Sequence, residues 1–177
     1  MGDRSAGPLE ELYRRPGFLI RRAQQIAVSL FLEETGALGI TNTQYGILLV
    51  LKHRPGIDQI SVAKLLGLDR STTGMVLGKL EKAGLIERCV VEEDRRKRNL
   101  ALTQAGERML ERLAEPARRA QAHVLSAFTA QERAAFLELL EKLVGKFNGS
   151  TRVPIGKRRA DERGVRTRRT AKAELAV

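Results

Sequence analysis

At 177 residues, 42% of them hydrophobic and only 4% aromatic, the chain suits one compact, mainly helical domain with or without a tail. It has neither a run of about 18 apolar residues nor a signal-peptide segment, and Cys89 has no second cysteine to pair with, so we expect a cytoplasmic protein without a membrane span or an internal disulfide. The net charge of +11 is compatible with a polyanionic partner such as nucleic acid.

The N-terminal part of the chain carries two helical patterns. Apolar residues at helical spacing predict a long helix over residues 9–37, either kinked or restarted at Pro16. The sequence from Thr41 to Gln44 is a capping box, which predicts a second helix that runs to about residue 54. Pro55-Gly56 then ends that helix.

Two shorter helices follow in close succession. Asp58 is placed to cap a third helix that stops at Gly67. Asp69 is placed to cap a fourth helix over residues 70–82, which Gly84 closes. Helical spacing turns the apolar side chains of this fourth helix inward and leaves these residues facing outward: Arg70, Ser71, Gly74, Met75 and Gly78.

The remainder of the folded region is predicted as a hairpin and two helices. Residues 85–91 and 97–102 are β-prone and predict a two-stranded hairpin with a charged tip. Thr103 can cap a long helix to about residue 128, kinked at Pro116, and a second capping box at Thr129 opens a last helix to about residue 147.

Both ends of the chain lack apolar periodicity. We predict a flexible N-terminus over residues 1–8 and a disordered basic tail over residues 149–177. Within the tail, residues 150–177 hold nine Lys/Arg against three Asp/Glu. Such a segment either attaches loosely to phosphates or remains a solvated tail without a defined partner.

The motifs in this order resemble the MarR family of winged helix-turn-helix transcription regulators. The resemblance covers roughly residues 9–148 and rests on a set of short matches: Thr41-x-x-Gln44, Leu66-Gly67-Leu68, LEKAGLIER at residues 80–88, and Asp94-Arg95-Arg96 followed by Leu102-Thr103 and Gly106. Each match is weak alone, and their combination is specific.

The resemblance implies a mainly α fold with a small two-stranded β-wing. The winged helix-turn-helix domain would span residues 41–103, and helices over residues 9–37 and 103–148 would form a dimerisation region. The family implies an obligate homodimer. The sequence supports this independently, because a lone monomer would expose the apolar stripes at both ends of the chain to water. Two recognition helices about 34–36 Å apart would then read a pseudo-palindromic operator in double-stranded DNA.

The fourth helix supplies the candidate base-reading residues. Arg70 is the strongest, because a guanidinium can pair bidentately with guanine in the major groove. Ser71 and Thr72 are candidates for contacts to bases or phosphates, and Met75 for contact with a thymine methyl group. Gly74 and Met75 depart from the family pattern, in which polar or basic residues are common there.

The hairpin supplies the candidate wing residues. The resemblance assigns Asp94 the role of orienting an arginine, best matched by Arg96, that enters the minor groove, where the negative potential attracts it. Arg95 and Arg98 are candidate phosphate contacts. Glu92-Glu93 departs from the family pattern, and the alternative for the whole tip is a charged turn with local ion pairs.

A ligand-binding role is implied for the first helix. The segment from Arg14 to Ala23 resembles family members that control the breakdown of aromatic acids or their coenzyme A thioesters, so a small aromatic carboxylate or an acyl-CoA is the expected effector. Arg22, beside Gln24 at the edge of the apolar stripe, is a candidate for binding a carboxylate or phosphate, with His53 assisting. The alternative for these residues is a packing edge, a cap or an interdomain salt bridge.

Other classes of function fit less well. Cys89 raises the alternative of a cysteine redox sensor, although an unreactive structural cysteine is the simpler interpretation. A structural nucleic-acid coating protein fits the charge but predicts little preference among sequences. We expect no enzyme, metal site or cofactor, because the chain has only His53 and His123, no Cys/His metal spacing and no phosphate-binding glycine loop.

Overall fold

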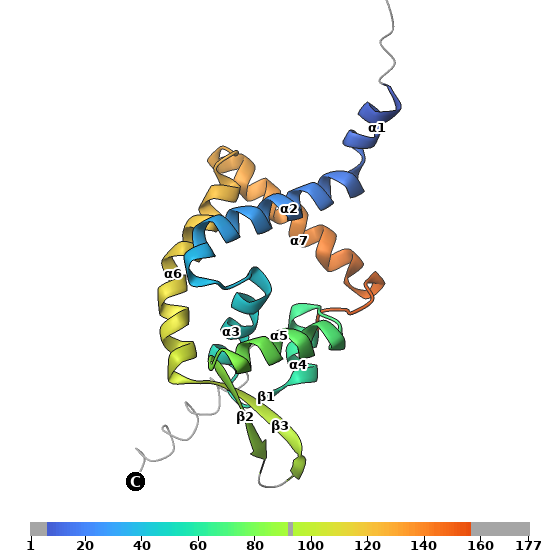
Figure 1. The fold of residues 1–177 in the computed structure, drawn as a ribbon. Helices are drawn as coiled ribbons and strands as arrows, with labels where there is room; N and C mark the ends of the chain where they lie inside the picture. Colours follow the sequence, from blue (N-terminus) through green and yellow to red (C-terminus); the bar gives the residue numbers. More distant parts are fainter. Residues whose placement is uncertain (1–6, 92–93, 157–177) are drawn as a thin grey trace, which may run out of the picture.

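The structure, a computed structural model, describes residues 7–91 and 94–156, without the side chains of residues 8, 90, 91 and 94–98 (Figure 1). This part of the chain is mainly helical with one small antiparallel sheet, which confirms the expected fold class. The α-helices are α1 (Pro8–Arg14), α2 (Pro16–Thr35), α3 (Asn42–His53), α4 (Gln59–Leu66), α5 (Arg70–Lys82), α6 (Gln104–Leu125) and α7 (Ala130–Phe147). The strands are β1 (Ile57–Asp58), β2 (Ile86–Val91) and β3 (Asp94–Leu102), and short 3-10 turns cover Gly36–Leu38 and Asn148–Ser150.

Local signals in the sequence set the helix boundaries. The first predicted helix is restarted at Pro16, because the residue before a proline disfavours the helical conformation and Arg15 is extended at φ −69° and ψ 133°. The capping boxes at Thr41 and Thr129 are both formed. Gly67 ends α4 in the left-handed conformation, at φ 64°.

The helices α3, α4 and α5, the sheet and the first half of α6 enclose the main hydrophobic core (Figure 1). Its fully buried side chains come from five elements: Ile47, Leu48, Leu51, Val62, Leu77, Leu80, Leu100 and Leu113. One face of α5 packs in this core, so the opposite face of the helix points to solvent in a fixed orientation relative to the rest of the lobe.

The sheet has three strands in the order β1-β3-β2, one more than the predicted hairpin. Ile57 pairs with Leu100 and Asp58 with Asn99. The Gly56 amide donates to the Leu100 carbonyl (3.1 Å), with Gly56 at φ 78°. This turn brings the chain before α4 against β3, a long-range pairing that no local pattern reveals.

The second half of α6 packs along α2, where Phe31, Ala117 and Ala120 are buried. The ring of Phe31 lies 5.6 Å from that of Tyr45, which joins this region to the main core. By contrast, α1 and α7 contribute no described side chain to the buried core, and α7 crosses behind α2 to return toward α4 and α5 (Figure 1). Large apolar side chains of α1, α2 and α7 are exposed, among them Leu9, Leu12, Tyr13, Leu19, Ile20, Ile26, Leu137, Leu139, Leu140, Leu143, Val144 and Phe147.

Residues 149–156 differ from the expectation of a disordered tail that begins at residue 149. They complete the 3-10 turn Asn148–Ser150, fold back on Asn148 and hydrogen-bond to α4 through Gly156. The predicted tail is therefore shorter at its start, and residues 157–177 lie outside the described chain.

Candidate nucleic-acid interface

A carboxylate cap fixes the start of α5. Asp69 accepts hydrogen bonds from the Thr72 amide (2.8 Å) and the Thr72 hydroxyl (2.7 Å). These hydrogen bonds, from the Thr72 amide first, lower the pKa of Asp69 below its ordinary value. The Thr73 hydroxyl donates to the Asp69 carbonyl (2.8 Å), so the first turn of α5 is held on both its outer and inner sides.

The same device fixes the start of α4. Asp58 accepts from the Ile60 amide (2.8 Å), the Ser61 amide (3.0 Å) and the Ser61 hydroxyl (2.6 Å). Burial acts to raise the pKa of Asp58, but the hydrogen bonds from Ser61 and Ile60 outweigh it and the pKa is lowered. The helices α4 and α5 are therefore both capped at their N-termini, and Gly67 begins the short turn that joins them.

The outward face of α5 lies as its helical spacing predicts. Thr73, Val76, Leu77 and Leu80 are buried, whereas Arg70 and Ser71 are exposed and Met75 is 58% exposed. Thr72 is half-buried and its hydroxyl proton is already donated to Asp69. In this geometry Asp69 engages the Thr72 hydroxyl proton, and the Thr72 oxygen keeps acceptor capacity.

The two outward glycines of α5 have different surroundings. A Cβ on Gly74 would lie 3.2 Å from the Gln59 side-chain nitrogen, so α4 and α5 pack closely at this point. A Cβ on Gly78 would meet no atom within 4 Å. The absence of a side chain at Gly74 therefore serves helix packing, and only Gly78 lies in open space.

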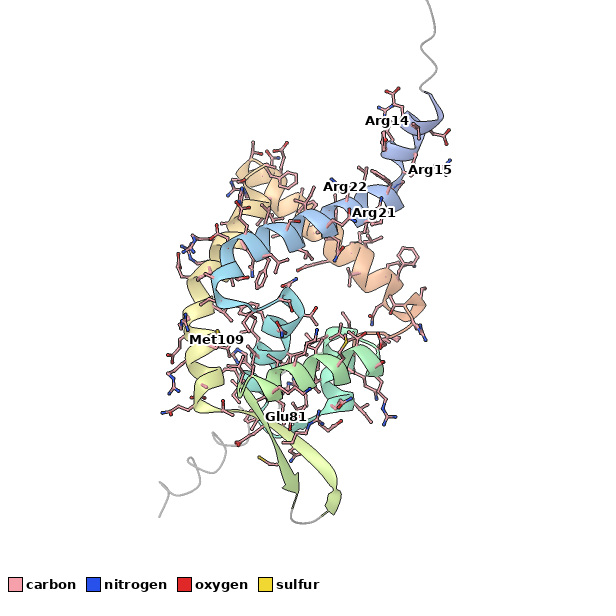
Figure 2. The ribbon with its side chains drawn as sticks, viewed as in Figure 1. Arg14, Arg15, Arg21, Arg22, Glu81 and Met109 are labelled. Atoms are coloured by element: carbon pink, nitrogen blue, oxygen red, sulfur yellow. The ribbon has the colours of Figure 1, made fainter. Side chains whose placement is uncertain are left out.

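A polar cluster of Gln59, Glu81 and Arg88 joins α4, α5 and β2 beneath the wing. Arg88 Nε donates to Glu81 (3.0 Å), and Arg88 donates through its terminal nitrogen to Gln59 (3.5 Å, at the limit of a hydrogen bond). Figure 2 shows Glu81 at the base of the hairpin. The sequence analysis did not predict this cluster, because Gln59 lies 29 residues before Arg88 and meets it only in the folded chain.

The wing is formed by β2 and β3, which pair from Ile86↔Leu102 to Val90↔Arg98 and then shift register after Val90. The β3 backbone carries Asp94, Arg95, Arg96 and Arg98, whose side chains lie outside the described part of the structure, as do residues 92–93. Cys89 is exposed and pairs through its backbone with Asn99.

The candidate ligand residues are distributed over two helices. Arg22 and Gln24 are exposed on α2, and Arg22 donates to the Gln25 side chain (3.0 Å). His53 is exposed at the end of α3. The helices meet at Phe31 and Tyr45. Arg22 lies nine residues before that contact on α2, and His53 lies eight residues after it on α3.

Arginines gather where α1 meets α2. Figure 2 shows Arg14, Arg15, Arg21 and Arg22 around this junction, at the end of α2 remote from Glu81. Arg15 pairs with Glu11 (2.8 Å), and the Arg21 guanidinium lies 5.0 Å from the centre of the Phe18 ring. The region combines positive charge with exposed apolar side chains.

Two other features are absent from the described residues, a metal-binding cluster and a membrane-spanning helix. No group of three or more His, Cys, Asp or Glu side chains is placed to hold a metal ion. No helix in residues 7–91 and 94–156 has the length and apolar character needed to cross a membrane.

Comparison with known proteins decides the family. The MarR family profile matches residues 38–97. A putative transcriptional regulatory protein for the hcr operon of Thauera aromatica is 33% identical over 128 residues, which cover 72% of this chain and 77% of that protein. The chain belongs to the MarR family.

Solved structures of other MarR-type regulators agree with the fold. The repressor CouR, bound to a 23-mer DNA duplex, matches with a TM-score of 0.70 and 29% identity over 81% of this chain and 99% of its own. BpsR of Bordetella bronchiseptica, whose DNA binding is regulated by 6-hydroxynicotinic acid, matches with a TM-score of 0.70 and 26% identity over 74% of this chain and 94% of its own.

The family membership gives the elements their roles. The chain is a DNA-binding transcriptional regulator of the MarR family, whose relatives are regulators rather than enzymes. Within it, α4 and α5 are the helix-turn-helix pair and β2–β3 is the wing.

Proposed function

We propose that this MarR-type regulator is a homodimeric repressor that binds a pseudo-palindromic operator and is released from it by a small aromatic carboxylate or an aromatic acyl-CoA. The observation that carries the proposal is the outward face of α5. Arg70, Ser71 and Met75 are exposed together there, on a helix whose first turn is fixed by Asp69 and whose inner face is held by the core.

The dimer is supported by the exposed apolar side chains of α1, α2 and α7. A single protomer leaves the α7 stripe of Leu140, Leu143 and Phe147 between 38% and 54% exposed. Exposure of an apolar stripe of this length to water is unfavourable, and packing against the same helices of a second copy would bury it. Two copies then present two α5 helices to successive major grooves.

Operator reading is tested with DNA selected from a random library. Arg70→Ala should flatten the differences in affinity between the selected operator and its point variants, because a bidentate contact to guanine discriminates by about 1–3 kcal/mol. Arg96→Ala should weaken all duplexes similarly and reduce the slope of log K against log salt by about 1. Lys79→Ala, at an exposed position near the other end of α5, is the matched control.

Selection of no preferred sequence would overturn the operator proposal and favour a DNA-coating protein. The coating alternative predicts equal affinities and steep salt dependence on every duplex. A specific regulator instead binds its operator on the order of a thousandfold more tightly than random DNA.

The effector proposal is supported by the arginine-rich junction of α1 and α2 and by the similarity to BpsR, whose DNA binding is regulated by 6-hydroxynicotinic acid. A thermal-shift screen of aromatic acids and their coenzyme A esters should identify a compound that raises the melting temperature, since a ligand that binds the folded state stabilises it. Arg22→Ala should reduce this shift, and Arg21→Ala, which removes the stacking on Phe18, is the control. A hit that leaves the operator complex intact would contradict release by this ligand.

The exposure of Cys89 keeps oxidation as a second candidate signal. Cys89→Ser should leave the response to an aromatic ligand unchanged under the ligand proposal. If peroxide releases the wild type from DNA and fails to release Cys89→Ser, the thiol is the sensor.

A further inference from the structure

The side chain of Gln59 occupies the space above Gly74 on the outward face of α5. Gln59 is the first residue of α4 and is half-buried. A Cβ on Gly74 would lie 3.2 Å from the Gln59 side-chain nitrogen, which is the nearest atom that another described element brings to this position. The amide of Gln59 therefore lies where the side chain of a larger residue at position 74 would begin.

Arg88 determines which way round the Gln59 amide lies. A terminal nitrogen of its guanidinium is 3.5 Å from Gln59 Oε1, so the contact is weak as a hydrogen bond. It still sets the orientation, because a guanidinium has only N–H donors and the reversed amide would place donor against donor. The oxygen of Gln59 thus faces Arg88, and its NH2 group, with two donors, faces Gly74.

Glu81 in turn fixes the position of Arg88. Arg88 extends from β2, and its side chain is only 27% exposed. Its Nε donates to Glu81 of α5 (3.0 Å), at the base of the hairpin in Figure 2. With Nε held by Glu81, a terminal nitrogen of the planar guanidinium is directed toward Gln59. Each side chain of the Glu81–Arg88–Gln59 cluster therefore orients the next.

The NH2 group of Gln59 lies within the face of α5 that meets DNA. Helical spacing places Arg70 one turn before Gly74 and Gly78 one turn after it, on the same face. Arg70 is exposed, and a Cβ on Gly78 would meet no atom within 4 Å. A helix-turn-helix protein presents this face of its second helix to the major groove. Gln59 thus adds a polar group from α4 to a stretch where α5 itself has two glycines.

We propose that Gln59 contacts DNA by donating hydrogen bonds at the place where Gly74 has no side chain, and that Arg88 and Glu81 are its positioning residues. The partner is an acceptor atom of duplex DNA, on a base edge in the major groove or on a phosphate. Because the Gln59 oxygen is turned to Arg88, the paired donor and acceptor contact of glutamine with adenine is not available. A base contact would therefore be to acceptors, such as O6 and N7 of guanine. The inference rests on the proposed operator binding.

Gln59→Met tests the contact, since methionine has a similar length and volume but no N–H donor. The affinity of the full-length protein for the selected operator should fall about tenfold, as expected when a hydrogen bond to DNA is lost. Gln121→Met makes the same chemical change at an exposed position of α6 and should leave the affinity unchanged. Melting temperatures of both variants separate a loss of binding from a loss of folded protein.

Point variants of the operator distinguish a base from a phosphate as the acceptor. If the acceptor is a base, Gln59→Met should lower discrimination at one base pair of each half-site and leave the others unchanged. If it is a phosphate, the loss should be equal for all duplexes, with an unchanged salt dependence because the amide carries no charge. Unchanged affinity for every duplex would overturn the contact.

Gln59→Glu provides a second test that preserves the cluster. The carboxylate still accepts from Arg88, so the packing of α4 on β2 is kept, but neither of its oxygens is a donor. This variant should bind the operator at least as weakly as Gln59→Met. Binding equal to that of the wild type would show that the side chain points away from DNA and would overturn the proposal.

A double-mutant cycle tests the positioning role of Arg88. If Arg88 acts through Gln59, Arg88→Met should lower operator affinity by a smaller factor in the Gln59→Met background than in the wild type. Equal factors in the two backgrounds would overturn this role. Glu81→Met gives a test of sign, because removal of an acidic side chain near DNA strengthens binding by charge alone. The positioning role predicts weaker operator binding, and stronger binding would contradict it.

These outcomes are distinguishable from failure of the proposed function. If the wild type prefers no operator, the proposed function fails. If the wild type selects an operator and Gln59→Met binds it equally tightly, only the contact by Gln59 is refuted.

Discussion

Gly106 joins the wing to the helix that leads out of the DNA-binding lobe, and Gly106→Ala tests how tightly this junction is built. Its amide donates to the Thr103 hydroxyl oxygen (3.1 Å), and Thr103 donates through its own amide to the Leu85 carbonyl (3.1 Å). A Cβ at position 106 would overlap the Leu85 carbonyl oxygen and lie 3.2 Å from a methyl group of Leu102. The main obstacle is backbone, which has no rotamer with which to move away.

The expected cost is about 3 kcal/mol, the upper part of the range for an overpacked core, because β2 or α6 must shift. For a chain of this length that corresponds to a fall in melting temperature of roughly 6–12 °C. The measurement is thermal or urea unfolding at one fixed protein concentration, since association with a partner subunit changes apparent stability.

Gly78→Ala is the matched control, with the same chemical change in the middle of a helix. A Cβ there meets nothing within 4 Å. Removal of a helical glycine should therefore stabilise the protein by about 0.5–1 kcal/mol. A Gly106→Ala variant as stable as the wild type, or both variants shifting in the same direction, would refute the packing explanation.

Three further predictions follow from surface groups. The pKa values of Asp58 and Asp69 are lowered in the folded state, so each carboxylate stabilises the fold above about pH 4 and loses this contribution as the pH falls through its folded-state pKa. Between pH 5 and 2.5, the urea midpoint of the variant with both residues changed to Asn should therefore decline less than that of the wild type. Lys52→Ala should cost at most about 1 kcal/mol on unfolding, because Lys52 and Glu107 are each half exposed; a larger loss would show that this bridge between α3 and α6 has a structural role beyond charge pairing. Leu140→Asp should halve the mass found by sedimentation, whereas an unchanged mass would place the dimer contact elsewhere.

Some parts of the fold were predictable from short stretches of sequence. The caps at Thr41, Asp58, Asp69 and Thr129 are all formed. They were predictable because a cap joins residues two or three positions apart, and the chain brings such residues together whenever a helix begins. The cap at Asp69 likewise made the start of α5 predictable, and the helical spacing of its apolar residues made the direction of its outer face predictable.

The geometry of the candidate ligand site could not be predicted from local sequence signals. Arg22 and His53 are exposed, as polar residues commonly are, and they lie on different helices, α2 and α3. Helical periodicity gives the face on which a residue lies, and it does not give the distance between two helices.

The sequence by itself therefore determined the order of helices, their caps and the exposed face of the recognition helix. Only the tertiary structure decided that β1 pairs with β3, that Gly106 faces the Leu85 carbonyl and that Gly156 binds the end of α4. Each of these contacts joins backbone groups that become neighbours only after the core has formed. The hydrogen-bonding groups of the backbone are the same in every residue, so their partners are chosen by packing and not by local sequence.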